Sequence, residues 1–294
     1  MFSDLTEKQL KDLKKYIKNY KNEFRDELNI PSETQFGCEI EFNTDKDISY
    51  YIKKISSRYD VKYDFSGDDI IEVTTPIMHN TAFDWNTMKE MMDSIKYATI
   101  KSNTGGHIHF DPNIINDYNF LNFLKLWCSL ENIIYDFSSG EFRELRTSIK
   151  SYAKRNSSLE DHIELIENGI LSLSSLNKYD KRYGLNLANH FDYFKSSSKD
   201  TYEVRVPNGS LNINTWQNNV EFFSKIFNYA NEYKNIRKIE KLYNIGKLES
   251  NFNNKLLVAD MLYNNEEAKI RFLNQFELDN EFADQKKLII PTYR

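Results

Sequence analysis

The sequence has little of several residues whose abundance would mark a particular class of protein. It contains 9 glycines and 5 prolines among 294 residues, and no stretch is rich enough in either to form a linker between domains. Its two cysteines, Cys38 and Cys128, lie far apart, and we expect free, buried thiols in a reducing compartment rather than a disulfide. Without a linker, we expect a single domain spanning residues 1–294.

Long apolar runs and a strong net charge are also missing. No segment approaches the roughly 20 apolar residues of a membrane-spanning helix, and we expect no signal peptide at the N-terminus. The formal net charge of −5 argues against a protein that binds nucleic acid through bulk positive charge, and it does not suggest binding to a membrane surface. We therefore expect a cytoplasmic protein with no nucleic-acid or membrane partner. The sequence also lacks the P-loop and protein-kinase motifs, so any nucleotide must be held by another device.

What the sequence does contain is a set of short stretches in which apolar and ionisable residues alternate. Successive side chains of a strand point to opposite faces, so each stretch would have one apolar face and one ionisable face. The four stretches are residues 36–42 (FGCEIEF), 69–74 (DIIEVT), 105–111 (GGHIHFD) and 202–206 (YEVRV). We expect one sheet, with helices on its apolar face and a site for cations and anions on the other.

The ionisable faces carry the candidate functional residues. Glu39 and Glu41 share a face, and because two carboxylates so close raise each other's pKa, they need water, basic side chains or metal ions. His107 and His109 point the same way, which favours contact with a metal or a phosphate over a structural role. Asp111 shares their face but precedes a proline, so a turn at the strand end is expected there. Glu203 and Arg205 share a face too, although that pair could be a cross-strand ion pair.

The oxygen-rich donor set indicates a hard divalent ion, because carboxylates suit magnesium or manganese better than zinc. Its members are Glu39, Glu41, Asp64, Glu72 and Glu203, with imidazole as a minority ligand. Five carboxylates carry about −5 and a nucleoside triphosphate would add roughly −4, so two or three divalent ions plus arginines would bring the site near neutrality. Phosphoryl transfer requires a site of this kind, because positioning and charge neutralisation supply most of its catalysis.

Helical periodicity accounts for much of the remaining sequence. Helices are predicted at residues 4–28, 47–57, 83–97, 117–137 and 215–234, with polar helices from residue 235 to the end. Further strands are predicted at 61–64 and 183–189, a basic helix or loop at 141–155, and a surface excursion at 157–178. Helices 83–97, 117–137 and 215–234 are expected to cover the apolar back of the sheet.

In this order, the motifs resemble the putative amidoligase family, which belongs with glutamine synthetase and glutamate–cysteine ligase to the carboxylate–amine ligase superfamily. The resemblance spans about residues 35–232 and rests on residues 36–42, 72–77 (EVTTPI), 104–109 (TGGHIH), 183–187 (YGLNL) and 202–207 (YEVRVP). It implies an α+β fold in which a curved, mainly antiparallel sheet, like the catalytic fold of glutamine synthetase, carries the active site on its concave face. The single catalytic domain would comprise a helical segment at 1–30, a ligase core at 35–232 and a helical extension at 235–294.

The resemblance also implies roles for individual residues. The metal ligands would be Glu39, Glu41, Asp64, Glu72, His107 and Glu203, and His109 would contact the nucleotide. Arg205 would neutralise the phosphate or acyl phosphate with help from Arg143 or Arg146, and Asn186 on the Asn-containing strand is a further catalytic candidate. The implied cofactors are ATP and two or three Mg²⁺ (or Mn²⁺) ions.

The reaction implied is the activation of a carboxylate, whose oxygen attacks the γ-phosphoryl group of ATP, followed by attack of an amine on the acyl phosphate to form an amide. The partners would be small-molecule or peptide carboxylates and amines. The resemblance does not fix the oligomeric state, and a homo-oligomer stays open. Two other functions also stay open: a metal-dependent phosphoester hydrolase, and a non-catalytic nucleotide-binding module on the same fold. The intact set of ionisable residues argues against the module.

Overall fold

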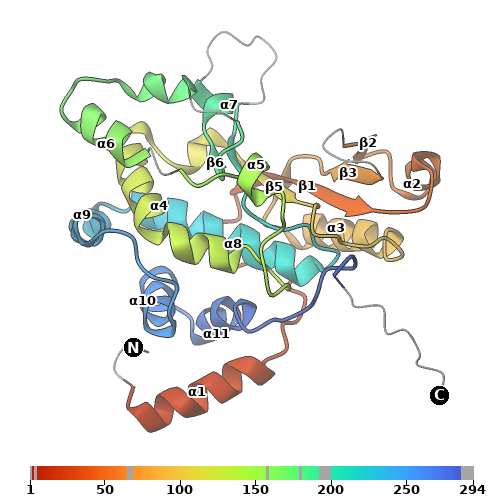
Figure 1. Cartoon of the computed structure of the whole chain (residues 1–294), viewed down its shortest axis with the longest axis horizontal. Coiled ribbons are helices and arrows are strands. Elements are labelled where there is room, and N and C mark those ends of the chain that lie inside the picture. The colour runs from red at the N-terminus through yellow and green to blue at the C-terminus, as the bar shows by residue number, and fades with distance from the viewer. Residues whose placement is uncertain are drawn as a thin grey trace.

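The computed structural model describes residues 2, 5–64, 69–156, 159–178, 181–191 and 200–285. These residues form an α+β fold with one open sheet and eleven α-helices (Figure 1). The predictions of an α+β class and of a mainly antiparallel sheet are confirmed. The closer likeness to the catalytic fold of glutamine synthetase stays a prediction.

The sheet has seven strands, and every strand pairing in it is antiparallel. The strands are β1 (Gln35–Asn43), β2 (Asp60–Tyr63), β3 (Ile70–Thr74), β4 (Met78–His79), β5 (Gly106–Phe110), β6 (Leu185–Asn186) and β7 (Tyr202–Val204). They lie in the order β2-β3-β1-β5-β7-β6, and the short β4 pairs with β1. The longest strand, β1, therefore lies between β3 and β5 near the middle of the sheet.

One face of β1 is apolar and fully buried, as the alternation predicts. Phe36, Cys38, Ile40 and Phe42 are each at most 2% exposed. Both cysteines are free and buried, as predicted for the thiols themselves, and burial raises the pKa of each thiol well above its usual value. With these side chains turned inward, Glu39 and Glu41 must face the other side of the sheet.

Three long helices cover the apolar face: α3 (Ala82–Ser94), α4 (Asp117–Phe137) and α8 (Ile213–Asn231). Each of these helices packs against a strand through a pair of aromatic rings. The ring pairs are Phe36 with Trp85 of α3 at 5.3 Å, Phe110 with Phe227 of α8 at 5.4 Å, and Tyr202 with Phe120 of α4 at 5.2 Å. The predicted cover of the sheet is confirmed, and α4 begins and ends at the residues that the periodicity indicates.

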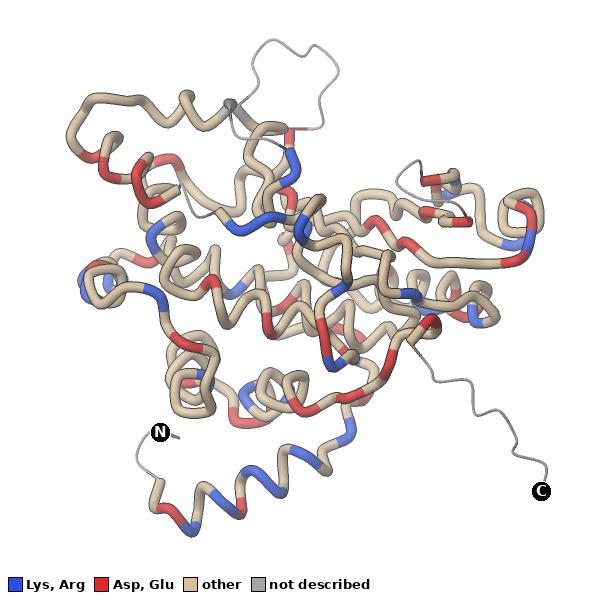
Figure 2. The backbone as a smooth tube through the Cα atoms, in the orientation of Figure 1, with Lys and Arg blue, Asp and Glu red and all other residues tan. Residues whose placement is uncertain are grey.

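The remaining helices lie around this framework. They are α1 (Glu7–Asn19), α2 (Ile48–Lys54), α5 (Ile149–Tyr152), α6 (Leu159–Glu167), α7 (Ala188–Phe191), α9 (Ile236–Ile245), α10 (Phe252–Leu262) and α11 (Glu266–Gln275). The predicted polar extension is less polar than expected, because Phe272 of α11 packs against Phe137 of α4 with ring centroids 5.2 Å apart. Residues 286–294, the last part of the predicted extension, lie outside the described residues. Figure 1 shows α1 beside α11, and Figure 2 shows Lys and Arg recurring along α1.

Three predicted elements differ from the structure. The helix predicted at 4–28 ends at Asn19. Beyond it, backbone amides that a longer helix would pair internally are bonded to side chains from other segments: the amide of Arg25 donates to Gln217, and the amide of Leu28 donates to Asn80. The strand predicted at 183–189 is reduced to β6 and is followed by α7. The segment 157–178, predicted as an excursion, contains α6. No helix in the described part of the chain has the length and apolar character needed to cross a membrane.

Candidate active site

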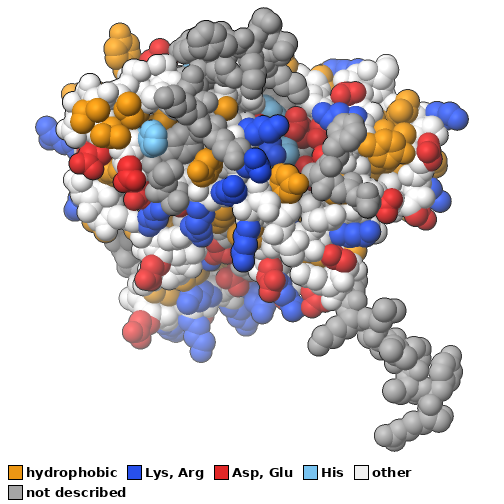
Figure 3. All heavy atoms as spheres, turned by 45° about the horizontal axis from the view of Figure 1, so that its top comes forward, with side chains coloured by type: hydrophobic (Ala, Val, Ile, Leu, Met, Phe, Trp, Pro, Cys, Tyr) orange, Lys and Arg blue, Asp and Glu red, His pale blue; other side chains and the backbone are white. Residues whose placement is uncertain are grey.

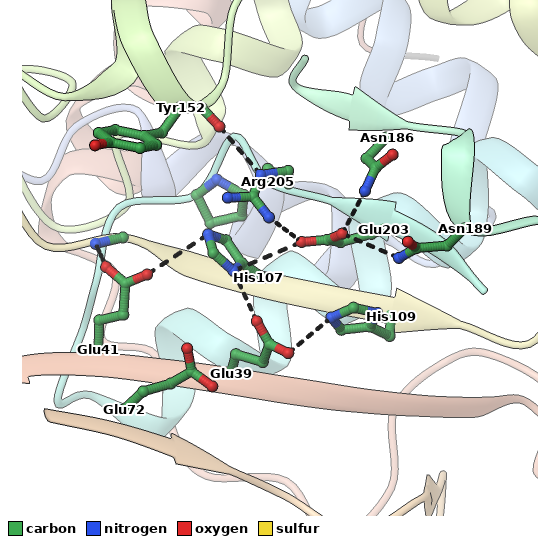
Figure 4. A network of polar contacts seen from close by, with 12 residues as sticks. Glu39, Glu41, Glu72, His107, His109, Tyr152, Asn186, Asn189, Glu203 and Arg205 are labelled. Atoms are coloured by element: carbon green, nitrogen blue, oxygen red, sulfur yellow. Dashed lines mark hydrogen bonds and ion pairs between the residues drawn. The ribbon is translucent and has the colours of Figure 1, made fainter. Parts of the chain in front are cut away.

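The ionisable faces of four strands meet on the side of the sheet opposite α3, α4 and α8. Strand register places their side chains in adjacent rows (Figure 4). The pairs that lie directly opposite one another are Glu41 with Glu72, Glu39 with His107, and His109 with Glu203. The structure thus brings together residues separated by more than 160 positions in the sequence. Their roles as ligands or catalysts stay predictions.

Glu39 lies between the two imidazoles. Its Oε2 is 2.9 Å from His107 Nδ1, and its Oε1 is 3.2 Å from His109 Nε2. Burial by itself would raise the pKa of Glu39, but the hydrogen bonds and charges of the two histidines outweigh burial and hold that pKa well below its usual range. Glu39 is therefore an ionised carboxylate.

Glu203 is held by donors on both of its oxygens. Arg205 donates to Oε1, while Asn186 and Asn189 donate to Oε2 at 2.6 and 3.2 Å. Although burial raises the pKa of Glu203, Arg205 and the two histidines of β5 lower it below its usual value. Asn186, predicted to be catalytic, thus orients Glu203. Asn189 was not predicted, because it lies on the short helix α7, where the sequence indicated a strand.

Glu41 and Glu72 form the other carboxylate row. Glu41 Oε2 accepts a hydrogen bond from the amide of Gly105 at 2.6 Å. Glu72 Oε1 is 2.7 Å from Lys62 Nζ and accepts from the Thr74 hydroxyl at 2.9 Å. Burial, followed by the charge of Glu39, raises the pKa of Glu72, and Lys62 opposes that rise. Lys62 was not singled out in the sequence, although it lies on the strand predicted at 61–64.

Several of the ionisable residues line a cavity of about 440 Å³. Strands β1 and β3, with the residue that follows β2, contribute its acidic side chains: Glu39, Glu41, Asp64 and Glu72. Its basic side chains come from other segments: Arg146, Lys181, Arg182 and Arg205. His107, Asn103, Ser148 and Tyr152 complete the lining. In Figure 3, Lys and Arg side chains lie beside Asp and Glu side chains around a hollow.

The structure separates the two arginines predicted to assist Arg205. Arg146 is buried, and its guanidinium donates to the carbonyls of Arg205 and Pro207, while burial lowers its pKa to about 10. Arg143 lies elsewhere, with its side chain 57% exposed and paired with Asp279 and Glu281 at 3.5 and 3.3 Å. Of these two, Arg146 alone belongs to the lining of the described cavity.

The chemistry of the donors fits a divalent metal ion. Glu39, His109 and Glu203 each offer a ligand atom, and these atoms all lie within 4.8 Å of one another. His109 Nδ1 lies 3.0 Å from the Thr201 hydroxyl, which fixes the ring, while its buried Nε2 points at Glu39 Oε1, 3.2 Å away. Metal-binding histidines commonly show this arrangement, with one nitrogen held by a neighbour and the other directed at the ligand set. The resemblance implies His107 as a metal ligand and His109 as a nucleotide contact. In the structure both imidazoles lie among the acids, with His107 2.9 Å from Glu39 and 3.7 Å from Glu203, and both roles stay predictions.

A second cavity, of about 350 Å³, lies next to His109. Its lining includes Gly37, Pro76, Ile77, Asp111 and Thr201. Gly37 lies opposite His109 in the strand register, and a Cβ built on it would meet its nearest neighbours only at 3.7 and 3.8 Å, so the cavity floor is open there. Asp111 accepts from the amide of Asn113 at 2.7 Å, which confirms the turn predicted at the strand end.

The sequence was compared with known protein families and curated proteins. The model of a family described as "putative amidoligase enzyme" matches residues 41–227, a range that contains Glu41 and strands β3, β5, β6 and β7. No curated protein matches the sequence significantly.

Proposed function

The chain belongs to the putative amidoligase enzyme family, and on that basis we propose that it is an ATP- and magnesium-dependent ligase that joins a carboxylate to an amine. The observation that carries the proposal is the cavity in which four carboxylates face four cationic side chains, beside a group of metal-donor atoms. A site with both charges can hold divalent cations and a polyanion together, which phosphoryl transfer requires.

The metal ligands follow from the two carboxylate rows. Glu39, His109 and Glu203 would hold one divalent ion, and Glu41, Glu72 and Asp64 would hold another. When bound, such ions neutralise the phosphate oxygens of the nucleotide. His107 lies 2.9 Å from Glu39 and 3.6 Å from Glu41, so its role would be to orient both carboxylates.

The nucleotide would span the two cavities. They adjoin, because Glu39 of the first is 3.2 Å from His109 of the second. Pro76 and Ile77 offer apolar surface to a purine base in the second cavity, and Ile77 is 72% exposed there. The triphosphate would then extend past His109 toward the basic side chains of the first cavity.

The carboxylate and the amine would meet in the first cavity. An oxygen of the carboxylate attacks the γ-phosphorus, the bond to the bridging oxygen breaks, and ADP leaves with the electron pair. The amine nitrogen then attacks the acyl carbon and inorganic phosphate leaves. Arg205 and Lys181 line this cavity and would stabilise negative charge on the transferred group, and the proton that the amine loses would pass to water.

The alternatives predict different products from the same side chains. In a phosphoester hydrolase, water would take the place of the amine and cleavage would need no ATP. In a non-catalytic module, magnesium–ATP would bind without turnover. The second cavity and the basic lining of the first favour the ligase, because hydrolysis of a simple phosphoester needs neither a base pocket nor an acceptor site.

The test is a turnover assay with ATP, magnesium and a panel of amino acids and peptides, with hydroxylamine as a general amine. We expect phosphate release that depends on the carboxylate, and a hydroxamate or amide detected by mass spectrometry. Glu41→Gln should abolish turnover, although its amide oxygen can still accept from Gly105. The matched control is Glu90→Gln, on the exposed side of α3. Full activity of Glu41→Gln would refute the site, and ATP-independent cleavage of phosphoesters would favour the hydrolase.

A further inference from the structure

Lys62 lies at the outer end of the carboxylate row formed by Glu41 and Glu72. It lies on β2, the edge strand of the sheet, directly opposite Glu72, and Glu72 in turn lies opposite Glu41. The Lys62 ammonium is 2.7 Å from Glu72 Oε1, and the Thr74 hydroxyl donates to the same oxygen at 2.9 Å. That carboxylate oxygen already has two donors.

The two partners of this ion pair differ in their access to water. The Glu72 side chain is 8% exposed, whereas that of Lys62 is 47% exposed. A buried carboxylate needs a cation nearby, because burial without one is costly. Lysine is suited to a reversible contact, since its ammonium is a strongly hydrated point charge on a flexible stem. A lysine on an exposed edge can withdraw into solvent without disturbing the core.

From this geometry we infer that Lys62 is an internal competitor for the divalent ion at Glu72. Its ammonium holds the carboxylate while the metal is absent and gives way when the metal binds. The inference rests on the proposed function, because it needs a metal ion at the carboxylate row of Glu41 and Glu72. Lys62 is thus a positioning residue that acts through Glu72 and sets how tightly the ion is held.

The competition predicts that removal of Lys62 strengthens metal binding. Metal must displace the ammonium, so removing Lys62 removes a competing cation and also removes its repulsion of the incoming ion. Losing a partly exposed ion pair that competes with the metal should change the metal-binding constant by about two- to fivefold. With the lost repulsion added, we expect Lys62→Met to bind metal about three- to tenfold more tightly. If Lys62 only shaped the site, its removal would leave metal affinity unchanged or weaker.

The experiment is a Mn²⁺ titration of the full chain without nucleotide, followed by electron paramagnetic resonance or calorimetry. Lys62→Arg keeps the charge and should stay within about twofold of the wild type. Lys181→Met is the matched control, because Lys181 lines the same cavity but is not the register partner of Glu72. Its effect should be smaller than that of Lys62→Met. Circular dichroism checks that each variant is folded.

The outcomes separate this inference from the proposed function. Tighter Mn²⁺ binding by Lys62→Met, with little change in Lys62→Arg, supports the competition. Equal or weaker binding by Lys62→Met overturns it while the metal site stands. If neither the wild type nor any variant binds Mn²⁺, the proposed metal site fails and the competition fails with it.

Discussion

Replacing Gly37 by valine tests where the nucleotide base binds. Gly37 lies on the site face of β1, two residues before Glu39 and at the floor of the second cavity. A Cβ there would stand 3.7 and 3.8 Å from Thr75 Oγ1 and the Pro76 carbonyl, which is ordinary van der Waals contact. The fold can therefore accept a side chain at this position.

The variant should weaken nucleotide binding without lowering the stability of the fold. Glycine within a strand costs about 0.5–1 kcal/mol of conformational entropy relative to alanine, so Gly37→Val should leave the free energy of unfolding unchanged or raise it slightly. The isopropyl group fills part of a cavity of about 350 Å³. A base forced to share that space would lose about 1–3 kcal/mol, which is about 5- to 150-fold in Kd.

Calorimetry with magnesium–ATP would measure the loss, and urea denaturation would measure the stability. Mn²⁺ binding without nucleotide serves as an internal control and should stay the same, because the backbone of β1 keeps Glu39 in place. Gly37→Ala should lose less affinity for ATP than Gly37→Val. If Gly37→Val folds normally and binds magnesium–ATP within twofold of the wild type, the base lies outside this cavity and that part of the reasoning is wrong.

Two further predictions concern the framework beneath the site. Phe227→Ala should lower the free energy of unfolding by about 3–5 kcal/mol, and Tm by roughly 5–10 °C in thermal denaturation, because its buried ring stacks on that of Phe123 with the ring centroids 4.2 Å apart. The control Tyr118→Ala should change little, because that side chain is 96% exposed. Arg146→Lys should lower the free energy of unfolding in urea denaturation by about 2–4 kcal/mol, because an ammonium cannot reproduce the forked guanidinium that donates to two carbonyls. The control Arg143→Lys should change that free energy by no more than about 0.5 kcal/mol, because Arg143 forms an exposed ion pair. Unchanged stability of Arg146→Lys would mean that the guanidinium contacts with these carbonyls do not stabilise the fold.

Local sequence patterns were sufficient to predict the elements whose side chains alternate or repeat without interruption. The apolar residues of β1 and the stripe along α4 each bury one face, and burial of that face decides the register of the element. For the same reason the sequence indicated that Glu39, Glu72, His109 and Glu203 belong to ionisable faces. Face assignment needs only the period of the side chains, and that period is a local property of the chain.

Elements that depend on distant partners could not be predicted in this way. The segment after Asn19 has helical periodicity, yet its backbone bonds to Gln217 and Asn80 instead of to itself. Arg143 and Arg146 lie three residues apart in one basic stretch, and only the position of the carbonyls after β7 decides which of them is buried.

The sequence by itself therefore determined which residue types share a strand face, because that follows from the alternation of side chains along a single strand. The tertiary structure alone decided which of those side chains contact one another, such as Lys62 with Glu72 and His109 with Glu39. Those contacts depend on strand order and register, which are set by the packing of α3, α4 and α8 on the opposite face rather than by any one segment.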